Sequence, residues 1–531
     1  MKRLSKKDMK QDLKIKLVDF EDGIACPGFR RISASVKLKY PQAKTYIYNV
    51  SNVSVQAFNI LSSDMSKKIT LNEKFLNDIS DSDIVAFSGM SKFSEYIKKS
   101  ASFIRKRNAK TIIVWGGIHA TVFPEDAISH ADAVCVGEGE KSFLSFLEKV
   151  SKEESIKESA GFWIRDKGKV IKNPLLPLMT SEELSCQPFQ DYSFEINHVT
   201  HHNIEPMTKD AYISQQGTKY MTLWSLGCPF NCTYCSNSKF LKNSSEYGKI
   251  RYARPEYLIN EIRTVLKYHD YVNYIELEDD NIFLINLPDL EKFAFLYKKE
   301  INLPLFLPGL HPKFVESKKL SLLIEAGLKK VRMGIQSGCQ STLDFYRRKT
   351  SLQEILKATN TISYFYPKIM PPFYDVIIDN PIETEEDRKE TLSFLRKLKR
   401  PFFLYVYSLR KIPGTELWDF AQNNPQYDFM GIEHTYQSIR DKSMAFMVYF
   451  LALFNPSDFV YNVFCKISKI KILNLMTFNI LVLFYMAKRF FYEIKIGNYQ
   501  PIAMISTRLA VLLIKEKNSL YAKRAKRQTA L

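Results

Sequence analysis

Three cysteines stand close together in the segment Gly227-Cys228-Pro229-Phe230-Asn231-Cys232-Thr233-Tyr234-Cys235, which directly follows a predicted strand. Three thiolates on one loop can hold three irons of a [4Fe–4S] cluster, and the fourth iron then stays open for a ligand. The alternative is structural zinc, which takes four ligands. No nearby His or Cys completes such a set, because His201 and His202 lie upstream and Cys186 is 42 residues from Cys228. The spacing therefore favours an iron–sulfur cluster.

Length and composition exclude several classes of protein. At roughly 100–200 residues a domain, 531 residues predict several domains. Hydrophobic residues make up 45% and charged residues 25%, values typical of globular chains rather than of disordered or fibrous ones. Eight cysteines are too few for a disulfide scaffold. The first 16 residues are basic and lack the apolar run of a secretory signal. We therefore expect a reducing cytoplasm.

Residues 1–150 alternate short apolar runs with helical patterns. This alternation predicts a doubly wound, Rossmann-like α/β domain with a parallel sheet. Ligands of such sheets bind at the carboxyl ends of the strands. The predicted strands cover residues 13–18, 45–50, 84–88, 111–115 and 133–136, and glycines follow the last two at Gly116, Gly117, Gly137 and Gly139. These glycines are candidate ligand contacts, and ordinary turn chemistry is the alternative.

Three further regions follow. Residues 151–205 are mixed and polar, which predicts a linker with a small hairpin near residues 161–171. Strand and helix patterns resume over residues 206–425 and predict a partial (β/α)6 barrel of the TIM type. The six expected strands cover residues 222–225, 274–277, 305–307, 330–333, 374–378 and 403–407.

The last region, residues 426–531, is apolar, basic and patterned as helices. The chain carries a net charge of +19, and residues 430–531 contribute 15 Lys and Arg against 5 Asp and Glu. Its apolar runs, at residues 443–454, 473–487 and 502–514, are shorter than the roughly 20 residues that span a bilayer or are interrupted by polar groups. Two interpretations remain open: interfacial helices on an anionic membrane, or a cap that covers the mouth of the barrel. No aromatic platform accompanies the basic residues 523–527, so we expect no nucleic-acid partner.

The cysteine segment, with Tyr234 before its last cysteine, resembles the radical SAM superfamily, whose cluster binds and cleaves S-adenosylmethionine. Residues 116–121 and 137–140 are similar to the cobalamin-binding domain that precedes some of these barrels. Together they resemble the cobalamin-binding radical SAM proteins, which include class B methyltransferases and the anaerobic magnesium-protoporphyrin ester cyclase. Four later segments are also similar to the superfamily: Arg251–Glu256, Glu278–Phe283, Gly334–Gly338 and Pro413–Leu417.

The resemblance implies roles for individual residues. Cys228, Cys232 and Cys235 would ligate the cluster. Tyr234, Gln336, Ser337 and Arg348 would contact S-adenosylmethionine, with Arg347 as an alternative to Arg348 for its carboxylate. The residues implied for the cobalamin surface are Ser88, Gly116, Gly117, His119, Gly137 and Gly139.

The sequence also departs from the family pattern. The Asp-x-His-x-x-Gly motif, whose histidine binds cobalt in other cobalamin proteins, is absent, and the comparable stretch is Asp19–Gly23. Leu226 replaces a common arginine, and Gln336 replaces a common glutamate. A Gly-x-Pro-Gly-Glu-Thr element is replaced by Asp379–Thr384, which lacks both glycines. These changes indicate a divergent member of the family.

Three functional hypotheses follow. The first is methylation of an unactivated carbon, and the second is a radical cyclase or other carbon-skeleton enzyme. The third, from another class, is a non-catalytic cobalamin or metal sensor. The expected cofactors are a [4Fe–4S] cluster, S-adenosylmethionine and cobalamin. The expected partners are a lipid-like or tetrapyrrole small molecule and an electron donor such as flavodoxin or ferredoxin. The expected location is the cytoplasm, with peripheral contact at the inner face of the membrane.

Overall fold

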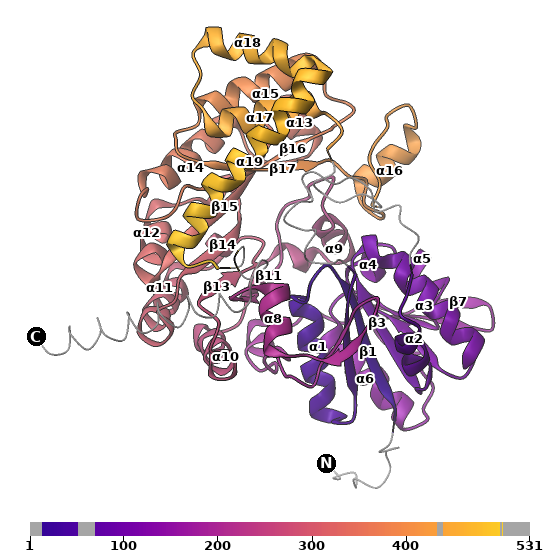
Figure 1. The fold of residues 1–531 in the computed structure, drawn as a ribbon. Helices are drawn as coiled ribbons and strands as arrows, with labels where there is room; N and C mark the ends of the chain where they lie inside the picture. Colours follow the sequence, from indigo (N-terminus) through magenta and orange to yellow (C-terminus); the bar gives the residue numbers. More distant parts are fainter. Residues whose placement is uncertain (1–12, 51–69, 433–438, 500–501, 503–531) are drawn as a thin grey trace, which may run out of the picture.

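The computed structural model describes residues 13–50, 70–432, 439–499 and 502. Within these residues two large β-sheets form separate layers, and helices from the C-terminal region pack on the second sheet (Figure 1). The α/β class expected from the sequence is confirmed, with a Rossmann-like sheet followed by a partial barrel and C-terminal helices.

The first sheet has nine strands in the order β7-β6-β5-β4-β3-β1-β2-β8-β9. Strands β1 to β5 are parallel, and the order reverses at β1, which pairs with both β2 and β3. This reversal is the switch point at which doubly wound sheets bind their ligands. The elements are β1 (Ile15–Glu21), α1 (Pro27–Lys39), β2 (Lys44–Asn49), α2 (Glu73–Ser80), β3 (Ile84–Gly89), α3 (Ser94–Arg107), β4 (Ile112–Trp115), α4 (Gly117–Val122), α5 (Pro124–Ile128), β5 (Ala133–Cys135) and α6 (Gly139–Ser151).

The segment expected as a linker adds four strands to this sheet. The hairpin of β6 (Phe162–Asp166) and β7 (Lys169–Lys172) is antiparallel and pairs with β5. A second hairpin, β8 (Asn197–Val199) and β9 (Ile204–Pro206), extends the other edge through β2. These strands are short and partly exposed, so their residues lack the apolar runs that predict buried strands.

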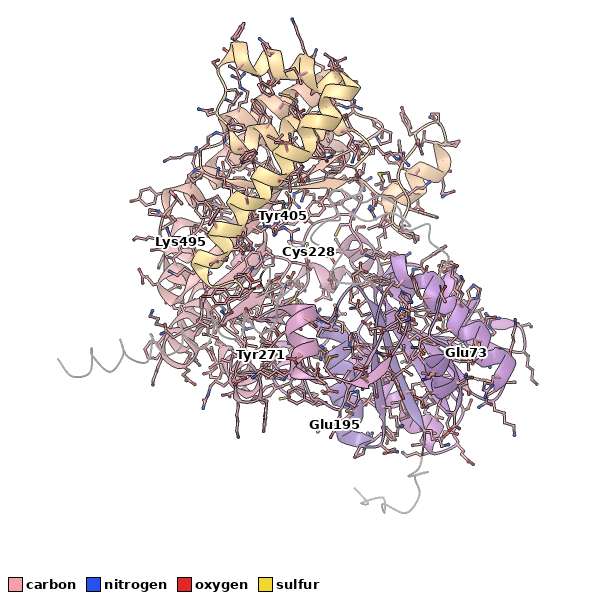
Figure 2. All side chains as sticks on the ribbon, in the orientation of Figure 1. Glu73, Glu195, Cys228, Tyr271, Tyr405 and Lys495 are labelled. Carbon is pink, nitrogen blue, oxygen red and sulfur yellow. The ribbon has the colours of Figure 1, made fainter. Side chains whose placement is uncertain are left out.

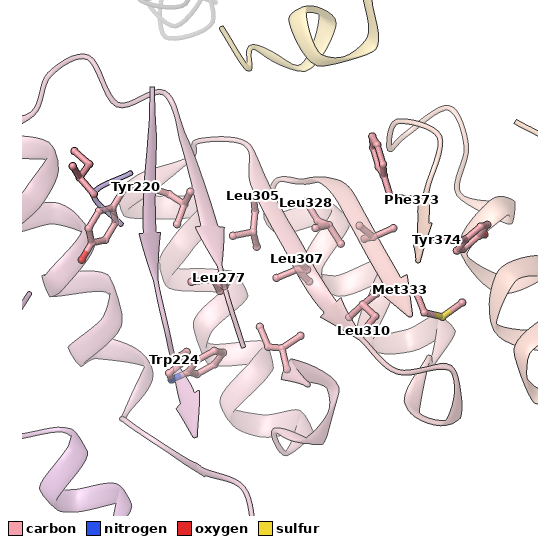
Figure 3. Packing of buried hydrophobic residues seen from close by; sticks show 14 of the residues in the cluster. Tyr220, Trp224, Leu277, Leu305, Leu307, Leu310, Leu328, Met333, Phe373 and Tyr374 are labelled. Carbon is pink, nitrogen blue, oxygen red and sulfur yellow. The ribbon is translucent and has the colours of Figure 1, made fainter. Parts of the chain in front are cut away.

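The second sheet contains six parallel strands in sequence order, an open barrel as expected (Figure 3). Five strands include the residues predicted, and the first lies three residues earlier than expected. The strands are β10 (Lys219–Thr222), β13 (Tyr274–Leu277), β14 (Leu305–Leu310), β15 (Leu328–Gln336), β16 (Phe373–Ile378) and β17 (Phe403–Ser408). The helices are α7 (Ser181–Leu184), α8 (Lys209–Gln216), α10 (Pro255–Tyr268), α11 (Leu287–Leu296), α12 (Ser317–Ala326), α13 (Gln340–Phe345), α14 (Leu352–Tyr364), α15 (Glu385–Lys397) and α16 (Glu416–Asn423).

The C-terminal helices are α17 (Lys442–Leu453), α18 (Asp458–Lys469) and α19 (Lys471–Ile496). Helix α19 lies at the amino ends of the barrel strands. In Figure 3 it is the pale yellow helix above the points where the strands begin. Its Tyr485 hydroxyl bonds to the Leu404 backbone, and its Glu493 carboxylate lies 2.5 Å from the Lys330 Nζ. The expectation of a cap over the mouth is therefore wrong for α19, which closes the opposite end. Among the described residues, no helix is long and apolar enough to cross a membrane.

The loops at the carboxyl ends of the two sheets contact each other. After β17, Gly414 packs directly against the Val122 carbonyl at the end of α4. After β5, the Glu138 carboxylate lies 2.8 Å from the Arg251 guanidinium, which belongs to the second domain. The two ligand-binding edges therefore adjoin each other.

A buried carboxylate fixes the first barrel strand to the second. Asp279, at the end of β13, accepts hydrogen bonds from the backbone N–H groups of Trp224 at 3.2 Å and Ser225 at 2.5 Å. Gly309 in β14 lies so close that a Cβ there would come within 1.8 Å of the Asp279 carbonyl oxygen. A side chain at position 309 would therefore displace the turn that leads into the cysteine segment.

We predict that Gly309→Ala lowers the free energy of unfolding by about 1–3 kcal/mol or more, because backbone atoms must move to relieve the overlap. The matched control is Gly28→Ala in α1, where a Cβ meets nothing within 4 Å. We expect the control to be neutral or stabilising by up to about 1 kcal/mol. Thermal unfolding of both variants tests this, and equal midpoints would contradict it.

Candidate functional site

The cysteine loop is held by backbone hydrogen bonds from three distant segments. It follows β11 (Ser225–Leu226), which pairs with β12 (Arg251–Tyr252). The Cys228 N–H donates to the Tyr247 carbonyl at 3.1 Å, and the Thr233 N–H donates to the Tyr346 carbonyl at 3.1 Å. The Leu417 N–H donates to the Thr233 carbonyl at 2.9 Å. In Figure 2 Cys228 lies between the two domains.

Gly227 allows the chain to enter this loop. Its φ of 112° lies in the region that side chains rarely adopt. A Cβ there would lie 2.6 Å from the Lys249 carbonyl oxygen and 2.8 Å from the Tyr247 carbonyl oxygen. Only glycine fits, so the glycine before Cys228 is a requirement of the loop.

The three thiols share one environment. Cys232 is buried, whereas Cys228 and Cys235 are half-buried. Burial raises the pKa of Cys228 and of Cys235 to about 12, and the negative charge of Asp280 adds to both shifts. Iron binding must therefore displace protons from these thiols. Asp280 lies beside the loop, although its motif gave it no role in the sequence analysis.

The thiols meet the chemistry that a cluster requires. Among the described residues, no three His, Cys, Asp or Glu side chains are grouped to hold one metal ion. A [4Fe–4S] cluster makes a different demand, because each thiolate binds its own iron. The loop provides three thiols, and its surroundings provide the polar groups described next.

Arg348 is the cation closest to the loop. Its Nη1 lies 4.0 Å from the Cys232 Sγ, and its Nη2 donates to the Gly334 carbonyl at 2.8 Å. Arg347 instead pairs with Glu416 at 2.5 Å and is exposed. Of the two arginines proposed for the carboxylate of S-adenosylmethionine, Arg348 therefore has the better position.

Gln336 ends β15 beside Arg348. Its φ of 66° is unusual for a residue other than glycine and marks backbone strain, which is common at functional sites. Ser337 is fully buried, and its hydroxyl lies 3.0 Å from the Thr391 hydroxyl of α15. The Tyr234 ring packs edge-on against Tyr346 with centroids 5.2 Å apart. Contacts of Gln336, Ser337 and Tyr234 with a cosubstrate stay predictions.

His311, which the sequence analysis missed, presents a hydrogen-bond donor beside the loop. Its ring stacks on Phe230 with centroids 4.0 Å apart. Burial, with the nearby Arg348 and Lys313, lowers its pKa to about 2, so the ring is neutral. Its Nδ1 accepts from the Lys313 N–H, so the proton is on Nε2. His311 directly follows the observed strand β14, which extends three residues beyond the strand predicted over residues 305–307.

Several polar atoms around the loop are buried without a partner in the described part of the protein. They are the Asn231 Oδ1, both amide atoms of Asn281, the His311 Nε2 and the Arg348 Nε. Leaving such atoms unbonded costs about 1–3 kcal/mol each. A polar ligand among them would offset this cost, so these residues fit a cluster with its cosubstrate.

The first domain places the other candidate residues along the carboxyl ends of β3, β4 and β5. Ser88 is the penultimate residue of β3, Gly116 and Gly117 follow β4, and Gly137 follows β5. Gly137 borders a cavity of about 260 Å³ between this domain, residues 175–179 and residues 243–244. Gly139 begins α6. These positions suit a ligand that lies along the sheet edge.

His119 differs from its neighbours. It is 1% exposed and lies 3.0 Å from the Ser91 hydroxyl and 2.9 Å from the Asp126 carboxylate. Both ring nitrogens therefore have partners within the domain, and its contact with cobalamin stays a prediction.

The switch point itself carries ionisable groups. Glu21 and Asp22 lie at the end of β1, and Lys92, after β3, pairs with Asp22. Burial raises the pKa of Glu21 to about 7. Burial, together with the nearby Arg410 cation of the second domain, lowers the pKa of Lys92 to about 8. The sheet edge therefore carries charged and polar groups at the position where doubly wound sheets bind their ligands.

Comparisons with known proteins agree with both halves of this site. Residues 223–395 match the family model of the radical SAM superfamily, and residues 51–147 match that of the B12 binding domain. The chain is 27% identical over 389 residues to an uncharacterized methyltransferase of Pyrococcus horikoshii, covering 71% of this chain and 76% of that protein. It is 24% identical over 288 residues to the anaerobic magnesium-protoporphyrin IX monomethyl ester cyclase of Rubrivivax gelatinosus, covering 52% and 48% respectively.

Among solved structures, the radical S-adenosylmethionine methyltransferase TsrM of Kitasatospora setae resembles this protein with a TM-score of 0.58. The likeness covers 77% of this chain and 76% of TsrM at 13% identity, so it concerns the fold alone. The combination of domains implies a [4Fe–4S] cluster, S-adenosylmethionine and cobalamin as cofactors. The chain is therefore an enzyme that combines a radical SAM domain with a B12-binding domain and is similar to methyltransferases of this arrangement.

Proposed function

We propose that this enzyme transfers a methyl group to an unactivated carbon of a small molecule. The observation that carries the proposal is that segments bonded to the cysteine loop contact the ligand edge of the B12-binding domain, at Gly414 with Val122 and at Arg251 with Glu138. Methyltransferases among its relatives support the choice of reaction.

When bound, the cluster and S-adenosylmethionine supply a 5′-deoxyadenosyl radical, and cobalamin supplies the methyl group. The overall change replaces one C–H hydrogen of the substrate with a methyl group and consumes two molecules of S-adenosylmethionine. It needs two electrons, which we propose come from flavodoxin or ferredoxin. The expected by-products are 5′-deoxyadenosine, methionine and S-adenosylhomocysteine.

The residues of the chain itself would bind and orient the cluster and S-adenosylmethionine. Cys228, Cys232 and Cys235 would hold the cluster, and Arg348 would pair with the carboxylate of the cosubstrate. His311 would donate from Nε2 to an acceptor on the cluster or cosubstrate. The contacts between Gly414 and Val122, and between Arg251 and Glu138, hold the two ligand edges against each other.

Radical cyclisation is the second candidate, because the chain is similar to a magnesium-protoporphyrin ester cyclase. The two reactions differ in their products, since only methyl transfer forms S-adenosylhomocysteine together with 5′-deoxyadenosine. A tetrapyrrole or lipid-like substrate is part of either proposal. A tetrapyrrole substrate is supported by relatives that are named after tetrapyrroles, such as the magnesium-protoporphyrin ester cyclase.

We predict that Cys232→Ala abolishes the formation of 5′-deoxyadenosine and S-adenosylhomocysteine but leaves cobalamin bound, because the cysteine loop and the B12-binding domain belong to different sheets. Iron content, product chromatography and the visible spectrum of bound cobalamin measure this. Cys186→Ala, which changes an exposed cysteine outside the loop, is the matched control. A Cys232→Ala variant that still makes 5′-deoxyadenosine would contradict the assignment of the cluster ligands. If the protein is a non-catalytic sensor, even the unaltered chain will form neither product.

We predict that Arg348→Gln raises the KM for S-adenosylmethionine by about tenfold or more, since a charge-assisted hydrogen bond is worth about 1.5–3 kcal/mol. Arg347→Gln is the matched control, because this neighbour pairs with Glu416 and is 55% exposed on its side chain. Initial rates of 5′-deoxyadenosine formation against cosubstrate concentration give both KM values. Equal KM values for the Arg348→Gln and Arg347→Gln variants would contradict the role assigned to Arg348.

We predict that His311→Phe keeps the stack on Phe230 but shifts the reduction potential of the cluster to a more negative value, because one donor to the cluster region is lost. Redox titration followed by electron paramagnetic resonance measures the shift. An unchanged potential together with an unchanged KM for S-adenosylmethionine would show that Nε2 contacts neither group.

A further inference from the structure

Helix α19 exposes an apolar stripe. Ile480, Leu483, Phe484 and Phe491 recur at helical spacing and are 56–72% exposed. Half of the exposed large hydrophobic side chains in the described part of the protein lie between residues 454 and 491. Contiguous exposed apolar surface marks a contact site, because its exposure to water is unfavourable.

The opposite face of α19 is fixed to the barrel. Phe478, Leu481, Val482 and Tyr485 are buried, and the Arg489 guanidinium donates to the Tyr405 hydroxyl at 2.5 Å. The Lys330–Glu493 ion pair adds a second buried polar contact. The helix therefore cannot turn its stripe inward without breaking these contacts.

Aromatic and basic side chains adjoin the stripe at the same end of the barrel. Tyr364 is 74% exposed and Tyr366 is 37% exposed, and the Tyr366 hydroxyl lies 3.4 Å from that of Tyr492 in α19. The basic residues are Lys368, Lys399, Lys488 and Lys495. The Lys399 carbonyl accepts a hydrogen bond from the hydroxyl of Ser363, the neighbour of Tyr364, and Lys488 lies near Arg400. Tyrosine and lysine beside apolar groups are typical of the membrane–water interface.

We propose that this barrel-bottom surface, formed by the α19 stripe with Tyr364, Tyr366 and the four lysines, docks on an anionic phospholipid bilayer. The inference goes beyond the proposed reaction. The lysines complement anionic headgroups, while the apolar stripe enters the boundary of the acyl chains. A second copy of the chain fits less well, since a two-fold pairing would bring the lysines of both copies together.

The docked orientation leaves the reaction chamber free. Because α19 lies at the amino ends of the barrel strands, the cysteine loop and the B12-binding domain lie on the side away from the bilayer. The electron donor and the substrate would reach the chamber from the aqueous side or along the domain boundary.

The test is co-sedimentation of the full-length protein with vesicles of phosphatidylcholine alone or mixed with phosphatidylglycerol. We expect binding only to the mixed vesicles, and weaker binding at high salt because ions screen the lysines. The double variant Leu483→Glu with Phe484→Glu should weaken binding by about tenfold or more. Lys368→Glu with Lys399→Glu should reduce the binding and its salt dependence.

Leu38→Glu is the matched control, because Leu38 is 75% exposed on α1 of the other domain. It should bind mixed vesicles like the unaltered chain, and thermal unfolding checks that all variants fold. No binding to mixed vesicles, or binding that survives the Leu483 and Phe484 changes, would overturn the proposal. If the protein binds no vesicles but forms a dimer, and only the Leu483 and Phe484 changes dissociate that dimer, the surface would be assigned to a second copy of the chain. Because no turnover is measured, these outcomes are independent of the proposed reaction.

Discussion

The cysteine loop depends on hydrogen bonds to distant segments of the chain. Its backbone is anchored to Tyr247, Tyr346 and Leu417, which lie in three different parts of the barrel. Arg348, which lies 4.0 Å from the Cys232 Sγ and donates to the Gly334 carbonyl, adds a fourth connection through the strand β15. A buried backbone must satisfy its polar groups, so the loop can adopt this form only when these segments are in place. The three thiols are therefore positioned by the completed barrel.

The same requirement shapes the rest of the molecule. Asp279 joins the turn before the loop to β13, and Gly309 allows β14 to approach that junction. At the other end of the barrel, α19 closes the amino ends of the strands through Tyr485, Arg489 and Glu493. The mouth then remains for the B12-binding domain. Two ligand edges that face one another are what radical formation and methyl transfer in one chamber require.

Much of the fold could be predicted because buried parallel strands are continuous apolar runs. Strands β13, β16 and β17 fall within one residue of the predicted bounds. The hairpin strands β8 and β9 could not be predicted, since they are three residues long and partly exposed. The position of α19 was also missed, because an apolar helix does not encode which end of a barrel it closes.

The sequence by itself predicted the cluster ligands, because the spacing of Cys228, Cys232 and Cys235 is a local property of one loop. It also determined the two families of domain, since their motifs are contiguous segments. Only the tertiary structure showed that Arg348, rather than Arg347, lies beside Cys232, and only it brought His311 and Asp280 to the loop. The reason is that these contacts join residues far apart in the chain, and their geometry depends on how the strands pack rather than on their local sequence.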